Sequence, residues 1–341
     1  MGTEIQQIQD ELLQLRTEIG DARAHLRTEH RRLRILGGVA IVTVAASILI
    51  SPANRAAMAQ AGTTLVDRVA ALEHKTVYMS ADTNSQTTTF SACNLRVDNG
   101  SGYTTATATN SAGAGLGNII IGYNEREEGN SRAGCHNLII GTYNSYSSFG
   151  GIVAGSYNTI SAAFATVTGG EQNLATGYAS SVSGGSQNGT SGAYSSVSGG
   201  NFNGAYGNYS SVTGGEDNSA EGANSVVSGG DINTAWGGWA SISGGSRNVA
   251  NGQYSSITGG DSNVTNAEGS TITSGEYNVA NGTYSAITGG NHNSVLGQYS
   301  SISGGYSGMT DTSAISSSIS GGYHDTQSTQ NGWMGGSLHS P

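Results

Sequence analysis

The sequence predicts an all-β protein built as a parallel β-solenoid. From Val167 to Gly305 the chain repeats one pattern with a period of 15 residues, as in Tyr194-Ser-Ser-Val-Ser-Gly-Gly200. One glycine recurs in phase from Gly155 to Gly305, and an asparagine stands three residues after each of these glycines from Asn158 to Asn293. A strict short period is typical of a solenoid, in which each unit buries its inner face only by stacking on copies of itself.

Each repeat supplies one aliphatic residue to the predicted interior. In Ser195-Ser-Val-Ser-Gly199 the side chains alternate, so Val197 points inward while Ser196 and Ser198 point outward. The predicted core aliphatic residues are Val167, Val182, Val197, Val212, Val227, Ile242, Ile257, Ile272, Ile287 and Ile302.

Half a turn later, Asn173-Leu-Ala-Thr-Gly177 alternates in the same way and directs the asparagine inward. An asparagine at the same place in every coil can bond to the next one, which predicts a ladder along the axis. The predicted ladder consists of Asn158, Asn173, Asn188, Asn203, Asn218, Asn233, Asn248, Asn263, Asn278 and Asn293. Two short strands per coil follow, with the Gly-Gly and Gly-x-Tyr steps as corners where only glycine tolerates the backbone.

The interior of such a coil is thin, because it holds one Val or Ile and one Ala. We therefore expect several chains to associate side by side as a homo-oligomer, with a lone monomer as the alternative.

Composition excludes an ordinary enzyme domain. The 341 residues include 54 Gly and 2 Pro, and only 11% are charged. The net charge is −10, and 12 of the 13 Lys and Arg residues lie before residue 133, which leaves Arg247 alone in the regular 15-residue repeats. We expect no nucleic-acid partner for the solenoid.

Residues 1–34 carry an a/d heptad seam, which predicts an N-terminal coiled coil. Residues 35–54 are predicted to form a transmembrane helix or signal anchor, and the arginines just before them place the N-terminus in the cytoplasm. In the alternative, signal peptidase cleaves after Ala59 in Ala57-Met58-Ala59 and the remainder is secreted. Both alternatives export the solenoid.

The remaining divisions are a short helical neck at 55–77, a lead-in segment at 78–117, solenoid repeats at 118–305, and degenerate repeats with a C-terminal cap at 306–341. Two similar stretches, beginning at Leu116 and Asn137, are expected to form the first irregular coils, where a solenoid needs a cap.

The sequence predicts no catalytic residue, cofactor or metal site. Cys93 and Cys135 lie on the exported side and either form a disulfide or remain thiols. Cys135-His136 has no evident third partner for nucleophilic catalysis. The seven histidines lack metal-ligand spacing.

One column of the repeat carries acids. Glu216 and Asp231, and likewise Asp261 and Glu276, are expected about 5 Å apart on neighbouring coils. Such pairs suit a retaining glycosidase or a shared cation. The alternative is a solvated edge, because other coils place Ser or Asn in this column. A further alternative is ice binding through outward ranks such as Thr271-Ile-Thr273, although most of these positions are Ser.

The run Asn224-Ser-Val-Val-Ser-Gly-Gly-Asp-Ile-Asn-Thr-Ala-Trp-Gly237 resembles the head repeat of the YadA-like trimeric autotransporter adhesins. The resemblance covers about residues 150–305. It implies a left-handed parallel β-roll, a homotrimer, and binding to extracellular matrix, glycan or another cell-surface ligand. The repeat here is one residue longer than the family's usual repeat, and no C-terminal translocator barrel is recognised. We expect a non-enzymatic fibrous rod, either an adhesin or a cell-envelope structural protein.

Overall fold

The computed structural model describes residues 69–70, 73, 78–82, 85–98, 104 and 115–335. The chain divides into two compact units, Met1–Leu95 and Arg96–Pro341. The predicted coiled coil at 1–34 and the predicted membrane segment at 35–54 lie outside the described residues. Within the described part of the chain, no helix has the length and apolar content needed to cross a membrane.

In the first unit, β1 (Met79–Asp82) pairs antiparallel with β2 (Thr87–Phe90). Every residue of both strands is exposed. Three residues of the predicted neck, Val69, Ala70 and Glu73, are helical.

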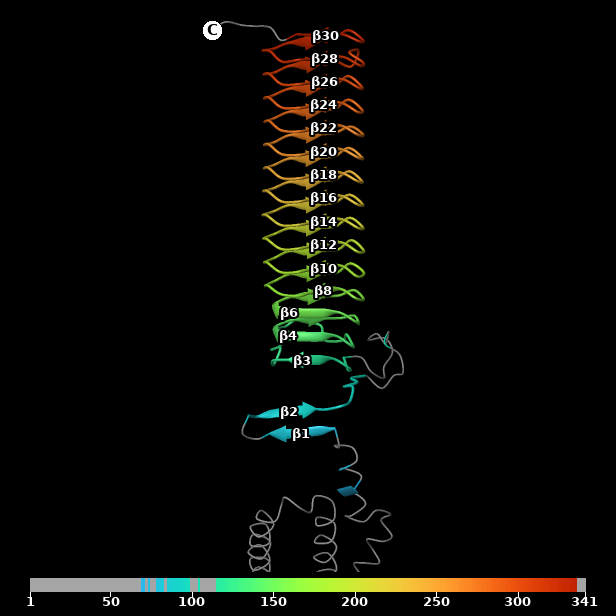
Figure 1. Ribbon diagram of the computed structural model, residues 1–341, viewed down its shortest axis with the longest axis vertical. Helices are drawn as coiled ribbons and strands as arrows, with labels where there is room; N and C mark the ends of the chain where they lie inside the picture. The colour runs from blue at the N-terminus through green and yellow to red at the C-terminus, as the bar shows by residue number, and fades with distance from the viewer. Residues whose placement is uncertain are drawn as a thin grey trace, which may run out of the picture. The chain divides into compact units, whose positions relative to one another are not determined.

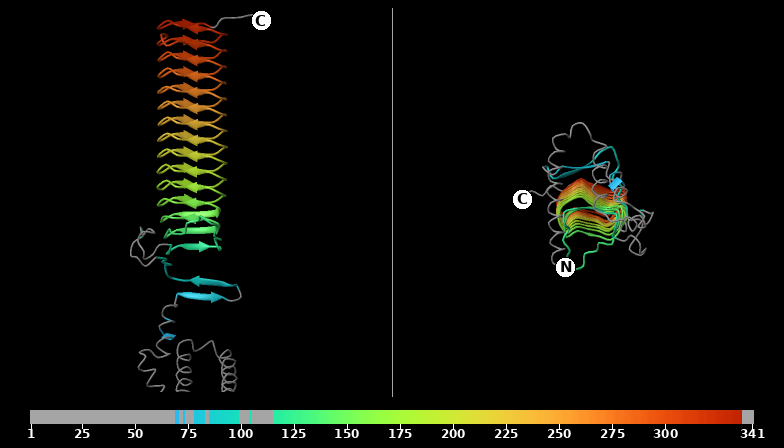
Figure 2. Two further views of the ribbon diagram at one scale, coloured as in Figure 1. Left: turned by 180° about the vertical axis from the view of Figure 1, so that it is seen from behind. Right: turned by 90° about the horizontal axis from the view of Figure 1, so that it is seen from below.

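The second unit confirms the predicted parallel β-solenoid. Figure 1 shows the strands stacked one above another, and the view along the axis in Figure 2 shows successive coils superimposed. Two parallel sheets run along the stack, one of 15 strands and one of 13. At about 4.8 Å per coil, the stack is on the order of 70 Å long.

The first sheet contains, in order, β3 (Ile119–Ile121), β4 (Leu138–Thr142), β6 (Ile152–Ser156), β8 (Thr166–Val167), β10 (Ser181–Val182), β12 (Ser196–Val197), β14 (Ser211–Val212), β16 (Val226–Val227), β18 (Ser241–Ile242), β20 (Ser256–Ile257), β22 (Thr271–Ile272), β24 (Ala286–Ile287), β26 (Ser301–Ile302), β28 (Ser318–Ile319) and β30 (Trp333–Met334). The second sheet contains β5 (Ser145–Tyr146), β7 (Thr159–Ile160), β9 (Leu174–Ala175), β11 (Gly189–Thr190), β13 (Gly204–Ala205), β15 (Ser219–Ala220), β17 (Thr234–Ala235), β19 (Val249–Ala250), β21 (Val264–Thr265), β23 (Val279–Ala280), β25 (Ser294–Val295), β27 (Met309–Thr310) and β29 (Thr326–Gln327).

The register of the first sheet follows the sequence period. Neighbouring partners are 15 residues apart from Thr166 to Ser301, as in Ser181 opposite Ser196. Beyond Gly305 the next partner of Ser301 is Ser318, so one coil absorbs two extra residues. The degenerate repeats after Gly305 therefore still form coils, and the ladder continues to β30.

A third parallel ladder joins the coils, with one residue from each coil. It includes Glu216 opposite Asp231 and Asp261 opposite Glu276. The backbone of the column that carries the acids is thus part of this ladder.

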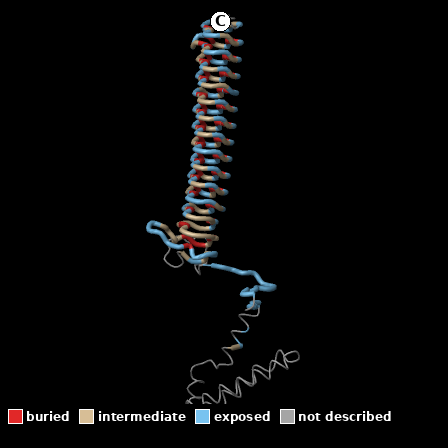
Figure 3. Tube along the Cα trace, turned by 90° about the vertical axis from the view of Figure 1, so that its left-hand side faces the viewer, coloured by how far each residue is buried: buried red, intermediate tan, exposed pale blue. Residues whose placement is uncertain are grey.

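The core lies between the two sheets, and Figure 3 shows buried residues along the inside of the whole stack. From β8 to β24 each first-sheet strand buries one Val or Ile, such as Val197, and from β9 to β23 each second-sheet strand buries one Ala or Thr, such as Ala205; all of these residues are at most 1% exposed. This pairing of one branched with one small side chain keeps the two sheets close together.

The corners differ from the prediction. In the repeats from Gly170 to Gly305, the second glycine of the Gly-Gly step has a φ between 82° and 96°, and a Cβ on Gly260 would lie 2.2 Å from the carbonyl oxygen of Gly275. The first glycine of the step has neither a positive φ nor a close backbone neighbour: a Cβ on Gly259 would meet nothing within 4 Å. At the other corners the left-handed residue is not glycine: it is Gln187 (φ 57°) and Tyr194 (φ 59°) in one coil. Glycine is required in the Gly-x-Tyr step by close approach, since a Cβ on Gly192 would lie 2.0 Å from a backbone oxygen of the next coil.

Candidate functional site

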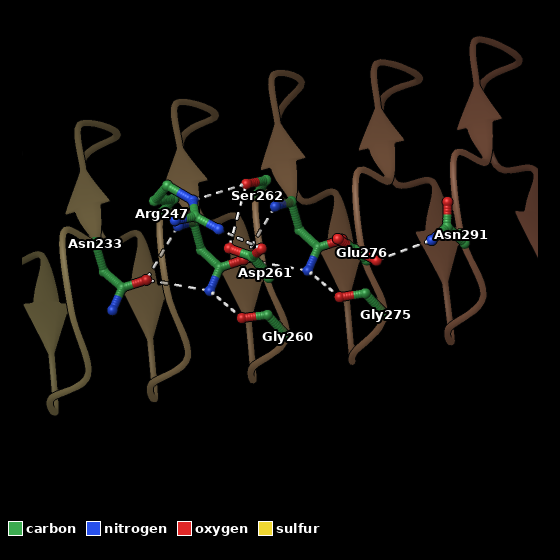
Figure 4. Close-up of polar contacts among 10 residues, drawn as sticks. Asn233, Arg247, Gly260, Asp261, Ser262, Gly275, Glu276 and Asn291 are labelled. Carbon is green, nitrogen blue, oxygen red and sulfur yellow. Dashed lines mark hydrogen bonds and ion pairs between the residues drawn. The ribbon is translucent and has the colours of Figure 1, made fainter.

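The ten asparagines of the predicted ladder are each at most 1% exposed. The Oδ1 atom of Asn233 accepts the backbone N–H of Asn248 at 3.0 Å, and its Nδ2 donates to the carbonyl oxygens of Gly229 at 3.1 Å and Gly245 at 2.9 Å. Figure 4 shows this chain of bonds passing from coil to coil. Each side chain therefore satisfies polar backbone groups that the tight corner leaves inside the coil.

The ladder is longer than the repeat pattern indicates. Asn158 N–H donates to Asn144 Oδ1 at 3.0 Å, and Asn144 N–H donates to Asn124 Oδ1 at 2.7 Å. At the other end Gly308 N–H bonds to Asn293 Oδ1 at 2.9 Å. The signal for the two additional asparagines is the Tyr-Asn pair, which occurs at 123–124, 143–144 and 157–158.

The ten predicted core aliphatic residues are also each at most 1% exposed. They belong to one continuous hydrophobic cluster that begins at Ile139 and reaches Ile319. The interior of the repeats is therefore filled by aliphatic and small side chains together with the asparagine ladder, and it leaves ligands only the outer surface.

Cys93 is exposed and Cys135 is buried. They belong to the first and the second unit respectively, so the disulfide considered above stays a prediction. The Sγ atom of Cys135 lies 3.7 Å from the carbonyl oxygen of Thr104, and His136 Nδ1 lies 3.2 Å from the same oxygen. The side chains of Cys135 and His136 thus both contact the backbone of Thr104 in the second unit.

The acid column lies on the outer surface. Glu216 is exposed, and Asp231, Asp261 and Glu276 are partly exposed. Arg247 Nη2 lies 2.5 Å from Asp261 Oδ2, and Asn291 donates to Glu276 Oε2 at 3.0 Å (Figure 4). The bond to Asp261 and its negative charge raise the pKa of Arg247 above its usual value. Asp261 is thereby occupied by a guanidinium, and it is not a lone carboxylate beside Glu276.

Among residues 115–335 and the other described positions, no three His, Cys, Asp or Glu side chains group closely enough to hold a metal ion. Hard cations need several oxygen ligands around one point, whereas a column presents them in a line.

One outer face is lined by hydroxyl groups. The exposed members are Thr168, Ser183, Ser198, Thr213, Ser228, Ser243, Thr258, Thr273, Thr288, Ser303 and Ser320. A second, partly buried column runs beside them; in it Ser196 Oγ donates to Ser211 Oγ at 3.2 Å, and Val226 and Ala286 interrupt it. The face is therefore regular along the axis but not uniformly hydroxylated.

A corner of the coil carries an edge of aromatic side chains, all exposed except the partly buried Phe149, which sequence reasoning did not identify as a surface. We call it the aromatic edge; it comprises Phe149, Phe164, Tyr178, Tyr194, Tyr209, Trp239, Tyr254, Tyr284 and Tyr299. Tyr194 and Tyr209 stack with centroids 5.1 Å apart and planes 7° apart. Such contacts contribute about 0.5–1.5 kcal/mol each and fix the rings in place. The signal was the in-phase return of Tyr or Trp before the strand in most repeats.

The outer surfaces thus offer hydroxyl, carboxylate and aromatic groups in rows that repeat at the coil spacing. A scan against models of protein families finds no match, and a search of curated proteins finds none. A surface of this kind can bind an extended or repetitive partner at many equivalent positions.

Proposed function

We propose that this protein is a non-enzymatic, surface-exposed fibrous rod that acts as an adhesin or a cell-envelope structural protein. The observation that carries the proposal is the uninterrupted parallel ladder of 15 strands, whose interior is closed by aliphatic side chains and the asparagine ladder. An array of this type keeps its shape over a long distance and presents its outer columns to a partner.

The manner of display belongs to the same proposal. The N-terminal segment 1–54 anchors the rod in the membrane through a coiled coil and a spanning helix, or is removed by cleavage after Ala59. Three chains associate with left-handed coils, as in the YadA-like adhesin heads that the repeat resembles. The thin interior, with one aliphatic residue per coil, supports association because it buries little apolar area in a single chain.

The competing function is hydrolysis of a polysaccharide by the acid column. The ion pair between Asp261 and Arg247 argues against the Asp261–Glu276 pair, because a nucleophile or acid of a glycosidase must face the substrate. Incubation with a panel of polysaccharides should give no depolymerisation. Depolymerisation that disappears in Glu216→Gln or Asp261→Asn proteins would refute the non-enzymatic assignment.

Binding is the positive test. Cells that display the full chain should adhere to matrix-coated or glycan-coated surfaces more than cells that lack it. Equal adherence on every surface would leave only the structural role in the envelope.

A second candidate is ice binding through the hydroxyl face, which is favoured by its exposed column of Ser and Thr at a regular spacing. Threonine at most positions would supply the methyl groups that such faces use, but serine predominates here. Thermal hysteresis of the full chain, lost in a Thr258→Asp and Thr273→Asp double variant, would establish this activity in place of adhesion.

A further inference from the structure

The outer face of the second sheet contains a depression where two successive coils lack a side chain. Other strands of this sheet begin with an outward residue such as Leu174, Thr234 or Val249, whereas β11 and β13 begin with Gly189 and Gly204. The depression has a volume of about 470 Å³. This size lies within the range of about 300–1,000 Å³ that is usual for small-molecule sites.

One side of the depression is formed by an aromatic ring that leans onto the sheet. A Cβ on Gly204 would lie 2.3 Å from Cε2 and Cζ of Tyr206 and 2.5 Å from its hydroxyl, so the hydroxyl end of the ring covers Gly204. Tyr206 is nevertheless 46% exposed. Desolvation raises the pKa of the Tyr206 phenol, and the carboxylates of Glu221 and Asp217 raise it further, so the hydroxyl stays protonated and can donate a hydrogen bond.

The rings of this depression differ from those of the aromatic edge. Tyr194 and Tyr209 stack on each other and thereby occupy each other's faces. Phe202, which also lines the depression, is 51% exposed. None of the ring pairs within the described residues involves Tyr206 or Phe202. Their outer faces remain available to a ligand.

Leu174 adds an apolar side chain to the lining, and the remaining side chains are polar and uncharged. They include the carboxamides of Gln172 and Gln187 and the hydroxyls of Thr176 and Ser191, and no residue that lines the depression carries a charge. Carboxamides both donate and accept hydrogen bonds, and hydroxyls do the same. This set suits a ligand that has many hydroxyl groups, an apolar face and no net charge.

We propose that this depression is a binding site for a neutral hexopyranose unit of a glycan. The C–H face of the sugar would pack on the exposed aromatic side of Tyr206 or Phe202, and its hydroxyls would bond to the carboxamides of Gln172 and Gln187. Among the described strands of the second sheet, only β11 and β13 begin with glycine, and these two strands lie in adjacent coils. The inference rests on the proposed function, since it supplies the adhesin with one class of ligand.

The repeat itself provides substitutions that keep the fold while they alter the site. Gly189→Val fills the depression with the residue that Val249 places in the same column, and a Cβ at Gly189 meets no atom closer than 3.8 Å. Tyr206→Asn removes the ring and installs the residue found at Asn251 in its column. Thr234→Val makes the same kind of change in that column at a coil that already has a side chain, and serves as the control.

Isothermal titration of the full chain with cellohexaose, maltohexaose and chitohexaose provides the test. At least one hexasaccharide should bind saturably, with a Kd that rises tenfold or more in Gly189→Val and in Tyr206→Asn and stays unchanged in Thr234→Val. No saturable binding of any of the three, or equal Kd values in all variants, would overturn the site. Hydrolysis of the bound sugar would instead refute the non-enzymatic function. Adherence that persists in cells displaying Gly189→Val would leave the proposed adhesin function standing but would reject this site as its adhesive contact.

Discussion

Replacement of Asn233 by leucine tests whether the asparagine ladder holds the coils together. Asn233 is fully buried, and its Oδ1 is the acceptor for the backbone N–H of Asn248. Leucine has a similar size but no polar atom, so this N–H loses its acceptor, as does the Nδ2 of Asn248, which also bonds to Asn233 Oδ1 at 3.1 Å. The carbonyl oxygen of Gly229 loses this donor, whereas that of Gly245 loses it but keeps the backbone N–H of Asp231.

The magnitude follows from these contacts. A buried N–H without a partner costs about 1–3 kcal/mol, and each of the other lost bonds costs about 0.5–1.5 kcal/mol. The free energy of local opening around residue 248 should therefore fall by about 2–6 kcal/mol. Because each coil contacts only its neighbours, the ends of the solenoid should remain folded.

Trypsin gives a direct assay, because Arg247 is the last of the Lys and Arg residues and is separated from the previous one, Arg132, by the greater part of the solenoid. Cleavage at the bond between Arg247 and Asn248 reports the opening of that coil. A loss of 2 kcal/mol corresponds to a rate of cleavage roughly 30-fold higher when opening is fast relative to cleavage. Fragment 248–341 should appear early and persist.

Asn251→Leu is the matched control, since it makes the same replacement four residues away from the scissile arginine. Asn251 is exposed, and its Nδ2 bonds to Asn266 Oδ1 on the surface at 2.7 Å. Its cleavage rate should stay within about threefold of the parent, as expected for a surface change of roughly 0.5 kcal/mol. Equal rates for Asn233→Leu and Asn251→Leu would refute the structural role of the ladder.

Two other predictions concern the corners and the thiols. Gly260→Ala should lower the free energy of unfolding by about 1–3 kcal/mol or more, because alanine is strained at a φ of 95° and its Cβ would meet the next coil. Gly259→Ala should have little effect, because its Cβ would meet nothing within 4 Å. Thermal unfolding of the two variants measures the difference. With maleimide, the native chain should react once, at the exposed Cys93, and the unfolded chain should react a second time at Cys135. A chain that reacts only after reduction would instead contain a disulfide.

The fold could be predicted because each coil of a solenoid has the same geometry, so the same residue types recur at the same position of every repeat. Val197 and Asn203 recur in phase, and the alternation around Val197 indicates which side is the interior. The corners were harder, because glycine indicates either a left-handed backbone or a close approach, and the pattern does not separate these causes. Gly260 has both properties, Gly192 has only the second, and Gly259 has neither.

The candidate sites were less accessible to sequence reasoning. The acid column was found because its members share one phase of the repeat. The ion pair between Asp261 and Arg247 was not predicted, because it joins side chains from two different columns on two neighbouring coils. The depression at Gly189 was missed for the same reason: it needs the lateral order of the columns, which places Tyr206 over Gly204 and beside Gln187.

The central claim is that the solenoid is displayed outside the cell as a rod that meets external partners. The most direct measurement is antibody labelling of the solenoid on intact cells that produce the full chain, with and without permeabilisation. The proposal predicts full labelling of intact cells and no increase after permeabilisation. Labelling that appears only after permeabilisation would contradict it.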